Sequence, residues 1–383
     1  MQKSDKKPHD DKSKAKESKA TPNDKFFAGI QSSVDVFFDP EREVPRFVKT
    51  GFQSLDTALG GGIANGLTIL GAKPGSGKTS LVHQIAEHIS SAEIPVLYFS
   101  LEMSREQINA KSMNRNLWRE LEKPENQRDQ KKFQGVTSRN FIFNNLPNIN
   151  LSDTEAKEPG KKLIKKAAEE ANKRLKHFYV VEPGTLIDGS VFGGRIAEIR
   201  AVIEKFIDFC GSKQPLVIID YLQIVGTDRE YATERQSVDA VIHELFPIKT
   251  KIPIILISSL NRGSYTAENE AKSVNTIGMG SFKESGNIEF SAEVLIGMQD
   301  ISENEDTEPR KISLKLLKHR YGRPGSEVLL FYNRKHDLFE ETPNRFDGAV
   351  GVTEQEIEQD RLWNQFMNAT GKMKKKEWVP DWK

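Results

Sequence analysis

Cysteine, net charge and long apolar runs are all scarce in this chain of 383 residues. The one cysteine, Cys210, excludes an internal disulfide and lies in a helical apolar pattern typical of an inert core thiol. The 56 basic and 55 acidic side chains leave a net charge of +1, so any nucleic-acid surface must be local. The longest apolar runs, 216–219 and 252–257, are far shorter than the roughly 18 residues of a membrane-spanning helix.

Both ends of the chain are polar. The amino terminus lacks the apolar core of a secretory signal, so we expect a cytoplasmic protein. Residues 1–25 carry eight lysines and five acids, a composition that predicts disorder. Residues 26–49 regain helix-like apolar spacing, which predicts a linker helix or arm that packs on its own domain or on a neighbouring subunit. Residues 341–383 end in lysines and two tryptophans, which fit either a docking peptide or a frayed terminus.

Short apolar strands alternate with amphipathic helices between residues 50 and 340. Each predicted strand is almost continuously apolar and is bounded by polar residues or proline. This alternation is typical of an α/β fold with a mostly parallel sheet, helices on both faces, and ligands at the carboxyl ends of the strands. The predicted strands cover 67–70, 96–99, 216–219 and 252–257, and the helices cover 81–89, 196–207 and 238–246.

A polar insertion at about 111–180 interrupts the alternation. Residues 120–132 are almost wholly polar and residues 144–150 are rich in asparagine, so surface loops are expected in both. Apolar residues recur every four positions from 163 to 175, which predicts one amphipathic helix whose lysines form a solvated face.

The strongest motif is a Gly-rich turn between an apolar run and an amphipathic helix, AKPGSGKT at 72–79. Glycines let backbone N–H groups approach oxygen anions closely, and a helix amino terminus favours negative charge. The strand–turn–helix context favours a phosphate loop over an ordinary turn. We therefore expect Lys78 to reach the β- and γ-phosphates and the Thr79 hydroxyl to bind Mg²⁺. The predicted nucleotide contacts are Ala72, Pro74, Gly75, Ser76, Gly77, Lys78, Thr79 and Ser80.

Two acidic residues follow predicted strands at the same edge of the sheet. Asp220 ends the run 216–219 and offers a carboxylate for the metal. Glu102 follows the run 96–99 and is placed to orient an attacking water. Either residue alone fits a cap or a surface charge, but together with the phosphate loop they favour a site that hydrolyses ATP.

Seven segments in a set order are typical of one family. They are TGFQSLDTALGGG (50–62), the phosphate loop, FSLEMS (99–104), IIDYLQIV (218–225), ISSLNR (257–262), FKESGNIEFSAEV (282–294) and LKHRYGRPG (317–325). Together they resemble the helicase domain of the bacterial replicative helicases, the DnaB family within the RecA-like ATPases. The resemblance runs from about residue 50 to 339, and FSLEM and DYLQ are specific to this family. It implies a RecA-like phosphate-loop fold, ATP and Mg²⁺ as cofactors, and a ring, expected to be a hexamer.

The resemblance also assigns roles to residues. Glu102 becomes the catalytic glutamate and Asp220 the acid that supports Mg²⁺. Lys318 and Arg320, two apart on a strand and so on one face, would project into the site of the next subunit. A planar guanidinium there can bridge charge on the transferring phosphoryl group. Without the resemblance, a pair of exposed strand residues is the simpler interpretation.

The FKESG segment resembles the central-channel loop by which these helicases hold single-stranded DNA. Lys283, Glu284 and Gly286 are the expected DNA contacts, with Arg262 on the preceding loop as a weaker candidate. Contacts to phosphate carry no base information, so binding should be independent of sequence and sensitive to salt.

Three features depart from the family pattern. Ser259, in Ser258-Ser259-Leu260, stands where the family has a glutamine that senses the γ-phosphate, and its shorter side chain puts the coupling of hydrolysis to loop movement in question. The residues before 50 have no counterpart of the family's amino-terminal collar domain, which engages primase. The insertion is longer than the family leads us to expect, and its extra polar segment offers a surface for a partner.

The sequence therefore predicts an ATP-dependent DNA helicase of replication that acts on single-stranded DNA, with a helicase loader or primase as a possible partner. The 5′→3′ direction of movement is what the family resemblance implies. An alternative stays open, a nucleotide-switched oligomeric ATPase or regulator that binds DNA or protein partners without unwinding. Ser259 and the missing collar fit that alternative. A recombinase-like strand exchanger fits less well, because FSLEM and DYLQ belong to the helicases.

Overall fold

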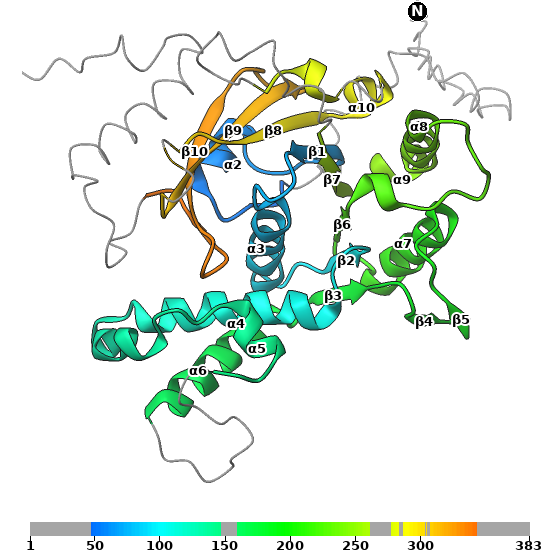
Figure 1. Cartoon of the computed structure of the whole chain (residues 1–383). Helices are drawn as coiled ribbons and strands as arrows, with labels where there is room; N and C mark the ends of the chain where they lie inside the picture. The colour runs from blue at the N-terminus through cyan, green and yellow to red at the C-terminus, as the bar shows by residue number, and fades with distance from the viewer. Residues whose placement is uncertain are drawn as a thin grey trace, which may run out of the picture. The chain divides into compact units, whose positions relative to one another are not determined.

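The computed structural model describes residues 47–146, 159–260, 277–282, 286–302, 304 and 307–342 (Figure 1). The predicted disordered segment, the predicted linker helix up to residue 46 and the carboxyl-terminal tail from residue 343 lie outside these ranges. Residues 47–49 are not helical, and Val48 forms an antiparallel bridge with Ile63. Within the described ranges, no helix is both long and apolar enough to cross a membrane.

A nine-stranded sheet forms the centre of the described chain. In spatial order its strands are β11 (Leu338–Glu340), β10 (Glu327–Asn333), β9 (Arg310–His319), β8 (Val294–Asp300), β1 (Gly66–Ala72), β7 (Pro253–Ser259), β6 (Leu216–Asp220), β2 (Val96–Ser100) and β3 (Phe178–Val181). The strands from β8 to β3 pair in parallel, whereas β9, β10 and β11 are antiparallel. The mostly parallel sheet and the four predicted strands are thus confirmed.

Helix α2 precedes β1, and the other helices lie in the connections between strands (Figure 1). Those predicted at 81–89, 196–207 and 238–246 are confirmed, although the last is split in two. The α-helices are α2 (Gln53–Ala58), α3 (Lys78–Ser91), α4 (Arg105–Leu121), α5 (Ser138–Ile142), α6 (Pro159–Arg174), α7 (Ile196–Cys210), α8 (Glu234–Glu244), α9 (Phe246–Lys249) and α10 (Gly286–Ser291). The 3₁₀ helices are η2 (Pro124–Phe133), η3 (Leu222–Ile224) and η5 (Met279–Phe282), and β4 (Leu186–Ile187) pairs with β5 (Ser190–Val191) in a separate hairpin.

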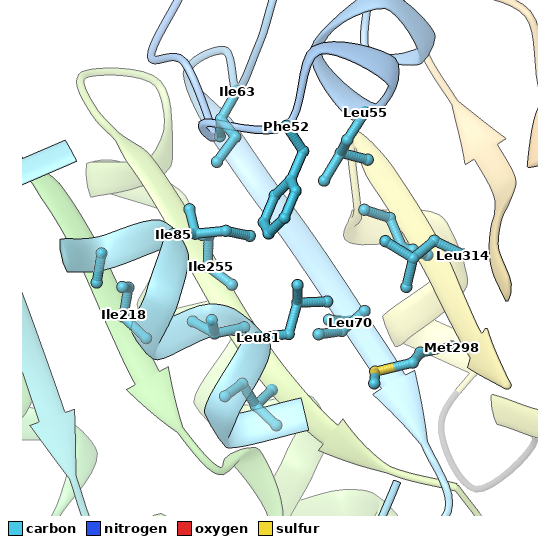
Figure 2. Close-up of a cluster of buried hydrophobic side chains, with 14 of the residues drawn as sticks. Phe52, Leu55, Ile63, Leu70, Leu81, Ile85, Ile218, Ile255, Met298 and Leu314 are labelled. Atoms are coloured by element: carbon cyan, nitrogen blue, oxygen red, sulfur yellow. The ribbon is translucent and has the colours of Figure 1, made fainter. Parts of the chain in front are cut away.

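Each face of the sheet is buried in its own hydrophobic core, because successive strand residues point to opposite faces. Figure 2 shows the core on one face, where Phe52 and Leu55 meet Leu81 and Ile85 of α3 over the strands. The opposite core receives the apolar residues of α7, α8 and α9. In β6, Ile218 belongs to the α3 core and Ile219 to the other core. Asp220, which follows Ile219, is therefore on the same side of the sheet as α3.

The insertion forms a small helical unit with a core of its own. Its buried residues are Leu117, Leu121, Phe133, Val136, Leu146, Leu163, Ile164 and Ala167. The helix predicted at 163–175 is confirmed as part of α6. The surface loop predicted at 120–132 is wrong, because the segment continues α4 and then forms η2. Pro124 opens η2 and the buried Phe133 ends it, which attaches this polar stretch to the core of the unit.

Candidate functional site

The phosphate loop connects the end of β1 to the start of α3. Gly77 caps α3 with a φ of 91°, and Gly75 has a φ of 77°. Residues with a side chain rarely adopt this left-handed conformation. A Cβ atom on Gly77 would also lie 2.7 Å from Cε1 of Tyr332. The turn therefore requires glycine, and it presents the amino terminus of a 14-residue helix at the carboxyl edge of the sheet.

The ammonium group of Lys78 lies within this loop. It donates hydrogen bonds of 2.9 Å to the carbonyl oxygens of Ala72 and Lys73. Burial lowers the pKa of Lys78 to about 8, against the opposing charges of Asp220 and Glu102. Phosphate oxygens would add negative charge beside the ammonium group and so favour its protonated form.

Asp220 is the buried carboxylate beside the loop, with 2% of its surface exposed. Tyr98 donates a 2.7 Å hydrogen bond to Oδ2, whereas Oδ1 is buried without a hydrogen bond of ordinary geometry from the described residues. Burial raises the pKa of Asp220, and hydrogen bonding by Tyr98 and Thr79 opposes this shift. A buried carboxylate oxygen in need of a partner, close to a threonine hydroxyl, is the hard oxygen chemistry that suits Mg²⁺.

A metal site built only from protein side chains differs from a Mg²⁺ site that is shared with a nucleotide. No group of three or more His, Cys, Asp or Glu side chains that could hold a metal occurs among the residues with described positions. The two protein groups at the loop, the Thr79 hydroxyl and the Asp220 carboxylate, would share a Mg²⁺ ion with phosphate oxygens and water. This arrangement is usual for Mg²⁺, which keeps several waters and takes few protein ligands.

Glu102 and Ser259 lie at the same edge of the sheet. Glu102 is exposed and lies two residues beyond β2. Burial has the largest effect on the pKa values of Lys78 and Asp220, and the negative charge of Glu102 raises both of them. The three groups are therefore within electrostatic reach of one another. Ser259 ends β7 and pairs in register with Ala72, the first residue of the phosphate loop. The edge therefore carries a cation, two carboxylates and a hydroxyl.

Gln223 is a residue of this edge that we did not predict. Its Oε1 accepts a 3.1 Å hydrogen bond from the Ser259 N–H, and its Nε2 donates to the Ser259 carbonyl at 3.0 Å and to the Ser258 hydroxyl at 2.9 Å. The side-chain amide thus connects the chain after β6 to the last residues of β7. Its sequence signal was the final position of DYLQ, which identified the family but gave no role.

Ser80 differs from the other residues of the predicted nucleotide set. Its hydroxyl is buried and lies 3.0 Å from Lys111 Nζ, 3.2 Å from Asp337 Oδ1 and 3.2 Å from the Tyr332 hydroxyl. All three partners come from segments that pack on α3. The Ser80 side chain therefore faces the interior, which leaves its backbone for any contact with a nucleotide.

Lys318 and Arg320 were both predicted on one strand, but of the two the strand contains only Lys318. Lys318 lies near the end of β9, and Arg320 comes directly after that strand. Lys318 Nζ donates to the carbonyl oxygens of Glu289 and Phe290 at 2.6 and 3.1 Å, and Arg320 Nη2 donates to Phe290 at 3.1 Å. The two cations therefore converge on the carboxyl end of α10.

The sheet register separates these cations from the phosphate loop of the same chain. Met298 of β8 pairs with Ala72, whereas Lys318 pairs with Leu295, three residues earlier in β8. At roughly 3.3 Å per strand residue, Lys318 lies about 10 Å away from the loop along the strand direction. Arg320 lies further in the same direction. The pair therefore faces away from the nucleotide edge of its own sheet.

Three of the predicted DNA contacts, Arg262, Lys283 and Glu284, lie outside the described residues. The fourth, Gly286, is the first residue of α10. Their grouping around a channel remains a prediction.

The fold agrees with comparisons to known proteins. The family model for the DnaB-like helicase C-terminal domain matches residues 47–176 and 166–341. The replicative DNA helicase DnaC of Bacillus subtilis is 27% identical over 308 residues, which cover 79% of this chain and 58% of that protein. The replicative DNA helicase DnaB of Pasteurella multocida is 25% identical over 313 residues, which cover 78% and 56%. The chain thus spans somewhat more than half the length of these relatives.

Solved structures show the same fold. The ATPase domain of G40P superposes with a TM-score of 0.61 at 15% identity and covers 82% of this chain and 98% of that domain. A DnaB-like replicative helicase, solved in a study of its interactions with primase, gives a TM-score of 0.59 at 16% identity. The sheet is thus that of the RecA-like ATPases. With a family model that matches most of its length, the chain belongs to the family of DnaB-like helicase C-terminal domains.

Proposed function

We propose that this chain is an ATP-driven DNA helicase that moves on single-stranded DNA as a ring, with each nucleotide bound between two copies. The observation that carries the proposal is the separation of two half-sites on one chain. The phosphate loop lies at one edge of the sheet, and Lys318 and Arg320 face away from it. Each copy could lend its loop to one neighbour and its cations to the other, a head-to-tail contact that closes into a ring.

Each residue has a chemical task in this proposal. The backbone N–H groups of the loop and Lys78 bind the phosphates, and Glu102 orients the attacking water and accepts its proton. Mg²⁺, when held by Thr79 and Asp220, supplies neutralisation of charge on the β- and γ-phosphate oxygens. Arg320 of a neighbouring copy, with Lys318 beside it, stabilises the charge that spreads over the transferring group.

The DNA contacts belong to the proposal as well. Arg262, Lys283, Glu284 and Gly286 would hold the phosphate backbone in the channel, and movement would run 5′→3′ as in the family. Ser259, with its main chain held by Gln223, stands at the start of the segment that leads to Arg262. We infer that hydrolysis is relayed to the DNA through this strand end, with a helicase loader or primase as a candidate partner of the ring.

A pair of variants tests the chemistry. Glu102→Gln removes the base but keeps the size of the side chain, so ATP binding should stay near wild type while turnover falls roughly 10²–10⁴-fold. Glu106→Gln is the matched control, because Glu106 is also an exposed glutamate and lies four residues later, at the start of α4. Binding of a fluorescent ATP analogue and release of phosphate measure the two properties. Wild-type turnover by Glu102→Gln would remove Glu102 from the mechanism.

A second assay decides between the helicase and the regulator. The wild-type protein should separate a forked duplex with ATP but not with a non-hydrolysable analogue, and single-stranded DNA should stimulate its turnover. Stimulated turnover without strand separation would instead support a nucleotide-switched regulator.

A further inference from the structure

The hydroxyl of Tyr98 donates a hydrogen bond to Asp220, the carboxylate that we propose as a Mg²⁺ ligand. Tyr98 is fully buried in β2 and pairs in register with Ile218, two residues before Asp220. Residues paired in this way, and residues two apart on one strand, share a face of the sheet. The phenol ring therefore lies on the same side as the Asp220 carboxylate and reaches it along the strand direction, with a hydrogen bond of 2.7 Å to Oδ2.

The position of the ring is fixed by packing rather than by the carboxylate. Tyr98 meets Phe178 of β3 edge to face, with the ring centres 5.6 Å apart and the planes at 81°. This geometry is favourable for aromatic pairs. A ring packed in this way presents its hydroxyl to the Asp220 carboxylate.

The two oxygens of Asp220 are consequently unlike. Oδ2 accepts the Tyr98 hydroxyl, whereas Oδ1 is buried without a hydrogen bond of ordinary geometry from the described residues. Ser100 pairs directly with Asp220 across the sheet, but its hydroxyl donates to the Met103 carbonyl at 2.6 Å. The final torsion of an aspartate is broad, so a directed hydrogen bond from a fully buried side chain restricts how the carboxylate is turned.

We propose that Tyr98 is a positioning residue for the Mg²⁺ ion of the nucleotide site: its hydroxyl holds Oδ2 of Asp220 and so keeps Oδ1 available to the metal or its bound water. The inference rests on the proposed role of Asp220 and extends it to a residue that touches neither nucleotide nor metal. Loss of a donor that orients a metal-binding carboxylate commonly lowers the affinity for the metal by about 10–100-fold.

Tyr98→Phe tests this directly, because it removes the hydroxyl and keeps the ring against Phe178. The readout is the Mg²⁺ concentration that half-saturates binding of a fluorescent ADP analogue to the full chain, with a parallel titration of nucleotide in EDTA. We expect the Mg²⁺ midpoint to rise about 10-fold. Binding in EDTA should stay within about two-fold of wild type, since the nucleotide itself does not touch the phenol.

Phe178→Leu is the matched control for packing. It loosens the ring contact at the same place but keeps the Tyr98 hydroxyl, so it should lower the Tm and move the Mg²⁺ midpoint much less than Tyr98→Phe does. The proposal is overturned if Tyr98→Phe titrates like wild type, or if Phe178→Leu shifts the midpoint as much as Tyr98→Phe does.

Asp220→Asn tests the metal role of Asp220 separately from the positioning role of Tyr98. It should raise the Mg²⁺ midpoint more than Tyr98→Phe, because it removes the carboxylate charge itself. If Asp220→Asn binds Mg²⁺ and nucleotide like wild type, the metal role of Asp220 is wrong and the role of Tyr98 fails with it. If Asp220→Asn shifts the midpoint and Tyr98→Phe does not, the inference on Tyr98 alone is wrong.

Discussion

At the scale of single residues, Lys78 shows how burial changes the chemistry of a side chain. A free lysine has a pKa of about 10.4 and therefore stays charged up to about pH 9. Burial in the loop brings the pKa of Lys78 to about 8, although Asp220 and Glu102 both favour the charged form. The charge that should hold phosphate is therefore half lost near pH 8 in the protein without nucleotide.

The affinity for nucleotide should consequently depend on alkaline pH. Phosphate binds the protonated lysine, so the affinity for MgADP should be constant below pH 8 and should fall above it. The slope approaches about tenfold per pH unit, since each binding event then takes up one proton. Titrations between pH 7 and 9.5 measure this. Lys78→Arg keeps its charge over the whole range, so its affinity, although different in size, should not show this slope.

If wild type and Lys78→Arg have the same pH profile, the titrating group is not Lys78. The loss of affinity would then have to come from another residue or from the nucleotide.

At the scale of elements, the phosphate-loop helix α3 is attached to α4 by buried charge. Arg115 of α4 forms an ion pair with Glu87 of α3, and both side chains are at most 1% exposed. Asn116 donates a 2.6 Å hydrogen bond to the other oxygen of Glu87, and Arg115 Nε donates to the Asp337 carbonyl at 2.8 Å. Burial alone would raise the pKa of Glu87, but Arg115 and Arg119 outweigh it and lower the pKa to about 2. The helix and the insertion are thus joined by groups that are costly to separate.

Removing one partner of this pair should cost more than removing both. Arg115→Met leaves the Glu87 carboxylate buried without its main counter-charge, and we expect a loss of about 3–5 kcal/mol in the free energy of unfolding. Adding Glu87→Leu to Arg115→Met should recover part of that loss, because apolar residues of similar size often replace a buried ion pair at little cost. Urea unfolding at pH 7 measures both variants.

A double variant that is less stable than Arg115→Met would contradict this account. It would mean that Glu87 stabilises the fold mainly through Asn116 or Arg119.

At the scale of the whole molecule, the proposed site would draw its two halves from different copies. Lys318 and Arg320 contact the end of α10, and the strand register places them away from the phosphate loop of the same chain. One copy would then bind nucleotide but hydrolyse it slowly. Assembly would control turnover, since it supplies the guanidinium.

Mixing two inactive variants should restore activity if this is correct. Lys78→Ala lacks a working loop and Arg320→Ala lacks the trans cation, and each should lose about 10³-fold or more of its turnover. In rings formed from equal amounts of the two variants, half of the copies carry an intact loop and the other half an intact Arg320. With head-to-tail contacts, about a quarter of the interfaces between subunits therefore combine the two. ATPase activity should therefore exceed the sum of the two separate variants and approach that fraction of wild type.

No gain on mixing, in samples that light scattering shows to be assembled, would place both residues in the same copy. Normal turnover by Arg320→Ala alone would remove it from the site altogether.

The sequence alone was enough to locate the phosphate loop and the acidic residues expected beside it. The phosphate loop, its flanking strand and helix, and the ends of the strands at Asp220 and Glu102 follow from apolar runs and glycine positions within a few residues. Strands β1, β2, β6 and β7 were predicted because both of their faces are buried, which makes them nearly continuously apolar. Such signals are local, so one chain segment is enough to detect them.

Other features depended on which segments meet, and only the tertiary structure decided those. The sheet order placed Tyr98 beside Asp220, Gln223 against Ser259, and Arg320 away from Ala72. The same long-range packing turned the Ser80 hydroxyl inward and made a 3₁₀ helix of a polar stretch that ends at Phe133. Periodicity reports which face of an element is buried, but it does not report the neighbour that buries it. Those neighbours come from pairings between residues that lie 36 positions apart for Gln223 and Ser259, 122 for Tyr98 and Asp220, and 252 for Ser80 and Tyr332.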